Sequence, residues 1–120
     1  MSAPRDDSVY LGHIRDSCIR IEFYVSGVSE EAFLQTELIQ DGVVRQIQVI
    51  GEAVKRLSRE FREANSGIPW SDIAGMRDKL VHDYMGIDLE AVWETARTDI
   101  PMLRNQLEGL ALPDEGSNGA

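Results

Sequence analysis

The feature that most constrains the fold of this chain is the spacing of its apolar residues, which is helical over nearly the whole length. Near the N-terminus, successive apolar positions lie 3 or 4 residues apart: Leu11, Ile14, Cys18, Ile21, Val25 and Val28. Residues 39–61 and 89–110 repeat these steps. No run alternates between apolar and polar residues for long enough to form a strand. The sequence therefore predicts an all-α fold.

Capping residues, glycine and proline divide this pattern into segments. We expect a short helix at "SEEAF", residues 29–33, and four longer helices over residues 8–28, 39–61, 70–86 and 88–110. Asp6, Asp7 or Ser8 should cap the first of these helices, and Asp88 should cap the last. Pro101 should kink the last helix near residues 97–101, because proline cannot donate the backbone hydrogen bond of a helix. Four helices with short connections favour an antiparallel four-helix bundle with one short extra helix.

Two glycines inside the long helix of residues 39–61 call for an explanation. Gly42 and Gly51 each cost about 1 kcal/mol relative to alanine in a helix. We therefore expect the backbone of a neighbouring segment to approach closely there. The first helix carries Tyr10, Phe23 and Tyr24 beside its main apolar stripe, and this extra apolar surface favours a dimer.

Length and composition indicate a single domain. The chain has 120 residues, and we place a helical domain at residues 8–111 between flexible termini, 1–7 and 112–120, that are small, polar and rich in Gly and Pro. Cys18 is the only cysteine, so we expect a buried, reduced thiol and a cytoplasmic protein. No segment is apolar over 18 or more residues, and no signal peptide is recognisable, so no membrane association is expected.

The balance of charge argues against broad binding to nucleic acid or to an anionic membrane. The net charge is −9, from 21 acidic and 12 basic residues. One basic cluster stands out against this background: Lys55, Arg56, Arg59 and Arg62. Cations near a helix C-terminus often only complement the helix dipole. The cluster is nevertheless the best candidate in the chain for contacts with an RNA backbone.

The stretch "MRDKLVHDY", residues 76–84, has too many polar groups for an ordinary core helix. If it is one continuous helix, Asp78 and His82 share a face, four residues apart. Arg77 and Tyr84 would share another face, seven residues apart. Arg77 and His82 would then lie roughly 140° apart and would flank a groove rather than touch. A second copy of the helix across a dimer axis would bring them together.

These side chains suit transphosphorylation of RNA. An arginine binds phosphate through two parallel donors, a histidine acts as general base or acid near neutral pH, and a tyrosine can bind a ligand or be modified. The simpler alternatives are a solvated Arg77 paired with Asp78 or Asp83 and a surface pair of Asp78 with His82. No metal or cofactor is expected, because the only histidines, His13 and His82, lie far apart and show no metal-ligand spacing.

The pattern R-x4-H-x-Y in "RDKLVHDY" resembles the HepT toxins of the HEPN superfamily, which pair with MNT nucleotidyltransferase antitoxins. The likeness extends over residues 10–110, through "FLQTELIQDGVVRQIQVIGEAVKRLS", "IPWSDIAGMRDKLVHDYMGIDLEAVWET" and the later "DIP". It implies an all-α HEPN bundle that forms a homodimer and acts as a metal-independent endoribonuclease in a type II-like toxin–antitoxin system. The RNA would be cut in a cleft between the two motif helices.

The resemblance also implies roles for individual residues. Arg77 and His82 correspond to the catalytic pair, and Asp78 takes the place where many members of the family have asparagine. Tyr84 is similar to the tyrosine that MNT antitoxins adenylylate, and an AMP group there would block RNA through its size and negative charge. Two other functions remain open: a non-enzymatic partner or substrate subunit of a nucleotidyltransferase, and a structural dimer whose Arg77 and His82 are sealed in salt bridges.

Overall fold

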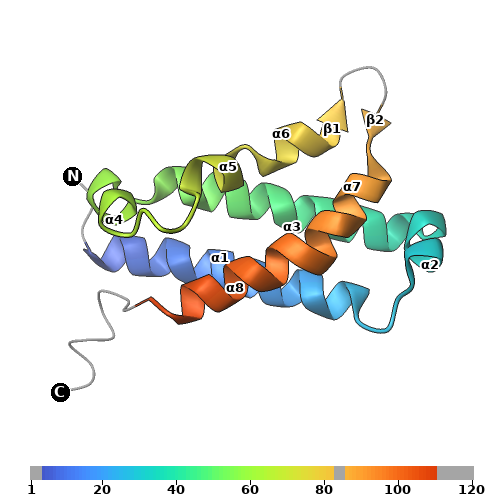
Figure 1. Cartoon of the computed structure of the whole chain (residues 1–120), viewed down its shortest axis with the longest axis horizontal. Helices are drawn as coiled ribbons and strands as arrows, with labels where there is room; N and C mark the ends of the chain where they lie inside the picture. Colours follow the sequence, from blue (N-terminus) through green and yellow to red (C-terminus); the bar gives the residue numbers. More distant parts are fainter. Residues whose placement is uncertain (1–3, 83–85, 111–120) are drawn as a thin grey trace.

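The computed structural model describes residues 4–82 and 86–110, and its helices form a bundle (Figure 1). The first half contains α1 (Pro4–Val25), α2 (Glu30–Gln35), α3 (Glu37–Arg56) and α4 (Arg59–Ala64). The second half contains α5 (Trp70–Ala74), α6 (Met76–Leu80), β1 (Val81–His82), β2 (Gly86–Ile87), α7 (Leu89–Glu94), the π-helical turn η1 (Thr95–Asp99) and α8 (Ile100–Glu108).

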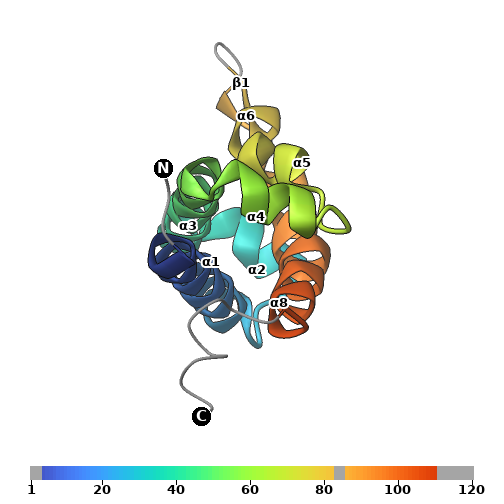
Figure 2. The same ribbon diagram turned by 90° about the vertical axis from the view of Figure 1, so that its left-hand side faces the viewer.

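The bundle has four sides. α1 and α3 run antiparallel along their length, α8 closes the bundle against α1, and α5 with α6 lies against α3 (Figures 1 and 2). The short α2 joins α1 to α3 at one end. The apolar stripes of the sequence meet in one core, which includes the fully buried side chains of Ile14, Cys18, Ile47, Val92 and Ile100. The predicted all-α bundle with a short extra helix is therefore confirmed, and no described helix is long and apolar enough to cross a membrane.

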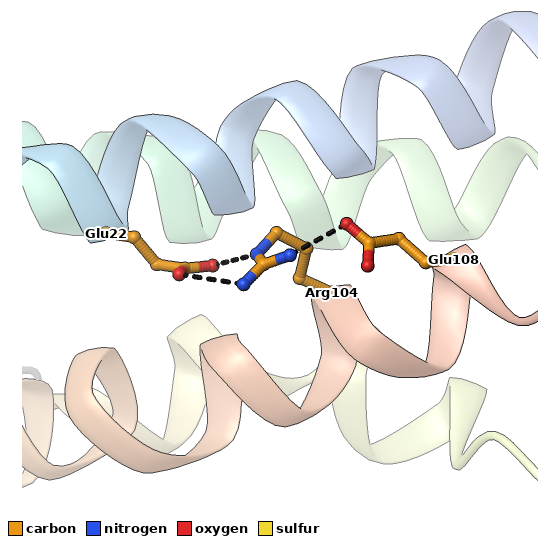
Figure 3. A network of polar contacts seen from close by, with 3 residues as sticks. All are labelled: Glu22, Arg104 and Glu108. Atoms are coloured by element: carbon orange, nitrogen blue, oxygen red, sulfur yellow. Dashed lines mark hydrogen bonds and ion pairs between the residues drawn. The ribbon is translucent and has the colours of Figure 1, made fainter.

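An ion-pair network joins the first helix to the last. The Nε and Nη2 atoms of Arg104 in α8 donate to the two carboxylate oxygens of Glu22 in α1, at 2.5 and 3.3 Å (Figure 3). Its Nη1 atom donates to Glu108 at 2.7 Å. The hydrogen bond with Glu22, and then that with Glu108, raises the pKa of Arg104 above its usual value. This arginine is committed to holding α1 and α8 together.

The start of α1 differs from the prediction. The helix begins at Pro4, so none of the three proposed capping residues lies at its N-terminus, and the helix starts ahead of the domain boundary predicted at residue 8. Asp7 is buried, and its carboxylate accepts hydrogen bonds from the backbone N–H and the hydroxyl of Ser58, each at 2.7 Å. The outer domain limits stay a prediction.

The predicted helix over residues 39–61 is in fact two helices. α3 ends at Arg56, Leu57 is extended with ψ at 144°, and α4 begins after Ser58. The Ser58 hydroxyl accepts from the backbone N–H of Phe61 at 3.1 Å, which caps α4. A serine side chain that bonds to the backbone competes with continuation of a helix, and Asp7 secures that arrangement from α1.

The prediction of one helix over residues 70–86 is also wrong. α5 stops at Gly75, α6 stops at Leu80, and β1 pairs with β2 in an antiparallel hairpin that projects from the bundle (Figure 1). Strands of two residues are too short to show an alternating pattern in the sequence. Gly86 does adopt a positive φ, +78°, but it does so in the hairpin and not at the end of a helix. Arg77 and His82 therefore lie on different elements.

The remaining helix signals are confirmed. The Ser29 and Asp88 side chains cap α2 and α7 by accepting from the backbone N–H groups of Ala32 and Ala91, both at 3.1 Å. The predicted disruption near residue 97 is a π-helical turn, η1, and Pro101 occupies the first turn of α8 directly after it. A π-helical turn shifts the backbone pairing, which accommodates the N–H that proline lacks.

Candidate active site

Arg77 of α6 is partly open to solvent. Its side chain is 43% exposed, and its Nη1 atom lies 3.7 Å from a carboxylate oxygen of Asp78, which is itself 76% exposed. Such a contact is too long for a hydrogen bond and weak in water. The Nε atom is covered and meets no acceptor among the described residues. In contrast to Arg104, this guanidinium makes no close ion pair within the described part of the chain, which argues against a sealed structural role.

A groove of about 130 Å³ lies between α3 and the segment of α5 and α6, and Arg77 lines it. The groove is bounded by Gln48, Gly51, Glu52, Lys55, Ala74, Arg77 and Asp78. Lys55 comes from the last turn of α3, so the fold brings a second cation to the same groove. Glu52 accepts a hydrogen bond from the Gln48 amide at 3.2 Å. Two cations facing one groove can bind a phosphate and stabilise charge that develops on it.

Gly51 allows α5 to approach α3 closely enough to form this groove. A Cβ atom at this position would lie 3.0 Å from the carbonyl oxygen of Ala74, a tighter contact than most real Cβ atoms make. The close backbone approach predicted for Gly51 is therefore confirmed. At Gly42 the neighbour is instead a side chain, since a Cβ atom there would lie 3.3 Å from the ring of Tyr24.

Replacing Gly51 with alanine should destabilise the protein by about 1–3 kcal/mol, because the new methyl group would push α5 away from α3. Urea unfolding measures this loss. Gly12→Ala is the matched control: a Cβ atom at Gly12 meets nothing within 4 Å, so this helical substitution should stabilise the protein by up to about 1 kcal/mol. An equal gain from both substitutions would contradict the tight approach of α5.

The structure places Asp78 and the backbone of His82, but not every other residue of the predicted site. His82 is in β1, where its backbone pairs with Gly86. Its side chain, like Asp83 and Tyr84, lies outside the described residues. Because α6 ends at Leu80 and His82 belongs to β1, Asp78 and His82 do not share a helix face. The predicted pairing of Arg77 with Tyr84 lies outside the described residues. Asp78 lies next to Arg77 on the exposed side of α6.

The basic cluster does not stay together. The break between α3 and α4 leaves Lys55 in the groove with Arg77, whereas Arg59 and Arg62 line a separate hollow next to α5. Arg56 is exposed and lines neither space. The four cations therefore do not line one common space, and their contact with an RNA backbone stays a prediction.

Other reactive groups offer no competing centre in the described part of the chain. Burial raises the pKa of the Cys18 thiol to about 12, so this group is protonated and protected near neutral pH. His13 is exposed and stands edge-on to Tyr10 with 6.0 Å between ring centres. No group of three or more His, Cys, Asp or Glu side chains is placed to hold a metal ion among the residues described.

The sequence was also compared with known proteins. The family described as "Ribonuclease HepT-like" matches residues 14–110, from the middle of α1 to just beyond the end of α8. The chain belongs to the HepT-like ribonuclease family. This assignment confirms the family predicted from the sequence and places the chain among ribonucleases of the HEPN type.

Several relatives support this assignment over the full domain. An RNase candidate of Caldanaerobacter subterraneus subsp. tengcongensis is 44% identical over 108 residues, which cover 90% of this chain and 94% of that protein. An RNase candidate of Methanocaldococcus jannaschii is 38% identical over 114 residues, covering 95% and 94%. A probable ribonuclease HepT of Thermococcus cleftensis is 37% identical over 106 residues, covering 88% and 96%. No solved structure matched the chain.

Sequence reasoning missed part of the groove of this HepT-like protein. Gln48 and Glu52 line it beside Lys55, on the exposed side of α3. Their spacing of four residues indicates a shared helix face but not what lies opposite that face. Only the contact of α3 with α5 and α6 shows that Arg77 is the neighbour.

Proposed function

We propose that this HepT-like protein is a metal-independent endoribonuclease and the toxin of a HEPN/MNT toxin–antitoxin pair. The observation that carries the proposal is the groove in which a half-exposed Arg77, without a close ion pair to any described residue, lies beside Lys55. The family of the chain supplies the substrate class, RNA. We expect the protein to act in the cytoplasm, where such a substrate is present.

In the proposed reaction a ribose 2′-hydroxyl attacks the adjacent phosphate. The O2′–P bond forms and the P–O5′ bond breaks, which leaves a 2′,3′-cyclic phosphate on one product and a 5′-hydroxyl on the other. His82 takes the proton from the 2′-hydroxyl, and a proton is returned to the leaving 5′-oxygen. Arg77 stabilises the charge of the phosphorane, with Lys55 as a second cation. Asp78 orients the arginine and histidine pair, and no metal or other cofactor takes part.

A homodimer would complete this site. Arg77 and His82 lie on different elements, α6 and β1, so one chain does not present them on one helix face. Phe23 on α1 and Leu38 on α3 are large apolar side chains that lie exposed on the single chain. Exposed apolar surface of this kind favours association. We propose that two copies pair and that their motif segments line a common cleft.

The test is RNA cleavage by purified protein in the presence of a chelator. We expect cleavage to persist in EDTA and the products to carry cyclic phosphate and 5′-hydroxyl ends. His82→Ala should leave only background products, whereas His13→Ala, on the exposed side of α1, should cleave normally. Identical products from wild type and His82→Ala would refute the nuclease proposal, and loss of cleavage in EDTA would refute the metal-independent mechanism.

Regulation through Tyr84 follows from the proposed toxin role. A partner of the MNT nucleotidyltransferase class would transfer AMP from ATP to the tyrosine hydroxyl and release pyrophosphate. The added anion would repel RNA from the cleft. Co-expression with such a partner should increase the intact mass by one or more AMP groups. Tyr84→Phe should abolish the increase and Tyr10→Phe should not; an unchanged mass gain in Tyr84→Phe would assign the modification to another residue.

One observation favours a second function, that of a non-enzymatic partner or substrate subunit of a nucleotidyltransferase. Glu52 and Asp78 line the groove beside the two cations, so the groove itself is close to neutral in a chain of net charge −9. Such a groove attracts RNA less than a basic one. Growth arrest on expression of the chain alone would support the ribonuclease and exclude the purely structural subunit.

A further inference from the structure

A second hollow lies at the end of the bundle, between α4 and the start of α5. Its volume is about 480 Å³, and Arg59, Arg62, Ser66, Trp70 and Ser71 contribute to its lining. It shares no lining residue with the groove of Arg77 and Lys55. α5 separates the two spaces, since its first residues line the hollow and its last residue, Ala74, lines the groove.

Arg62 is the unusual residue of this hollow. It is half-buried, yet its guanidinium makes no hydrogen bond or ion pair with any described residue, and its Nε atom is covered without an acceptor. A guanidinium nitrogen that water does not reach normally has an acidic or polar partner. Arg104 shows the ordinary solution in this protein, with two carboxylates around it. The acceptor that Arg62 lacks is therefore best supplied by a ligand.

Arg59 can join Arg62 at little cost. Among the described residues its one ion pair is with Glu63 at 3.1 Å, and the two side chains are 83% and 68% exposed. An exposed pair four residues apart on a helix contributes at most about 0.5 kcal/mol, so an anion in the hollow could displace it. Arg59, Arg62 and Glu63 together give the hollow a charge of +1 within an acidic chain.

The wall of the hollow is held in place before any ligand binds. The indole Nε1 of Trp70 donates to the carbonyl oxygen of Asn65 at 3.0 Å, and the Asn65 amide donates to the carbonyl oxygen of Phe61 at 2.9 Å. The hydroxyls of Ser66 and Ser71 make no hydrogen bond within the described chain, so both are available as donors. A fixed wall with two arginines and two hydroxyls matches the acceptors of a phosphate group.

We propose that this hollow is a phosphate-binding pocket that holds a backbone phosphate of the RNA away from the bond that is cut. The assignment of this phosphate to RNA rests on the proposed ribonuclease function. The pocket explains why Arg59 and Arg62 lie apart from the groove in which the cleavage takes place. It also gives the enzyme a contact beyond the scissile phosphate, so that binding requires more than a dinucleotide. Free inorganic phosphate offers the same chemistry, and the test separates the two.

Trp70 provides a direct reporter of this pocket. The other tryptophan, Trp93, packs against Phe33 at the far side of the core, so Trp93→Phe leaves a single tryptophan in the wall of the hollow. Inorganic phosphate added to Trp93→Phe should change the fluorescence of Trp70 in a saturable way. Arg62→Gln in this background should abolish the change, and Arg56→Gln, which removes an exposed arginine outside the hollow, should preserve it. No saturable change, or the same change in Arg62→Gln, would overturn the pocket.

A second arm uses 2′-O-methyl RNA, which lacks the attacking hydroxyl and is not cleaved. Arg62→Gln should weaken its binding and lower the slope of log affinity against log salt by about 0.7, the value for one phosphate contact on a single strand. Arg56→Gln should leave the slope unchanged. If phosphate binds at Trp70 but the slope for RNA is unaffected by Arg62→Gln, the ligand is free phosphate and the RNA contact is refuted.

Two controls keep these outcomes interpretable. Arg62→Lys retains the charge but loses the forked geometry, so it should bind phosphate with intermediate affinity, and its melting temperature shows whether the site tolerates substitution. Asp16→Ala, on the exposed side of α1 and outside both spaces, should bind phosphate and 2′-O-methyl RNA like wild type. Phosphate binding in a protein that cleaves no RNA would leave the pocket standing and refute only the ribonuclease proposal.

Discussion

Arg77→Gln should lower kcat/KM for RNA cleavage by about 10²–10³-fold and leave the melting temperature unchanged. The loss follows from removal of a charge placed to stabilise the phosphorane. The unchanged stability follows from the structure, because Arg77 has only a 3.7 Å contact with an exposed Asp78 and its Nε atom has no partner among the described residues. Glutamine keeps the aliphatic part of the arginine side chain as far as Cδ and ends in a neutral polar group, so it removes the charge with little change to the packing next to the backbone.

Arg104→Gln provides the opposite case. It removes three hydrogen bonds that join α8 to α1 and to its own last turn, so it should lower the melting temperature while the groove keeps its cations. Arg56→Gln should affect neither property. If Arg77→Gln instead lowers the melting temperature as Arg104→Gln does, its lost activity reflects unfolding. Cleavage by Arg77→Gln at the wild-type rate would remove Arg77 from the mechanism.

The sequence predicts the fold correctly where a helix is indicated by residues close together in the chain. The apolar stripes of α1, α3 and α8 are regular, and Ser29 and Asp88 cap the helices that follow them. The break at Ser58 was not predictable, because the group that secures it, Asp7, lies 51 residues earlier in the chain. The hairpin after α6 was missed because strands of two residues carry no periodic signal.

The site was predictable as a set of residues but not as an arrangement. The motif identified Arg77, and the charge pattern identified Lys55. Their meeting in one groove depends on the approach of α5 to α3 at Gly51, which neither pattern encodes. The same reason explains the division of the basic cluster. A helix break of two residues sends Arg59 and Arg62 to a different space from Lys55.

Asp7→Ala should reduce the free energy of unfolding by about 3 kcal/mol, which is large for a domain whose total stability is about 5–15 kcal/mol. Asp7 is only 5% exposed, and both donors of Ser58 that bond to it are buried with it. Alanine would leave those two donors without an acceptor in a place that water does not reach. Urea unfolding measures the loss, and Asp16→Ala, on the exposed side of α1, should change stability by less than 0.5 kcal/mol.

The double variant Asp7→Ala with Ser58→Ala separates this contact from general damage to α1. The double variant should lose less stability than the sum of the losses in the two single variants, because each substitution removes the same pair of hydrogen bonds. Strict additivity, or a loss from Asp7→Ala no larger than that from Asp16→Ala, would contradict the assigned role.

α4 has only 6 residues, too few to be stable alone. Its anchorage to Asp7 therefore also positions Arg59 and Arg62. Asp7→Ala should weaken phosphate binding in the hollow, although Asp7 is not one of the residues that line it.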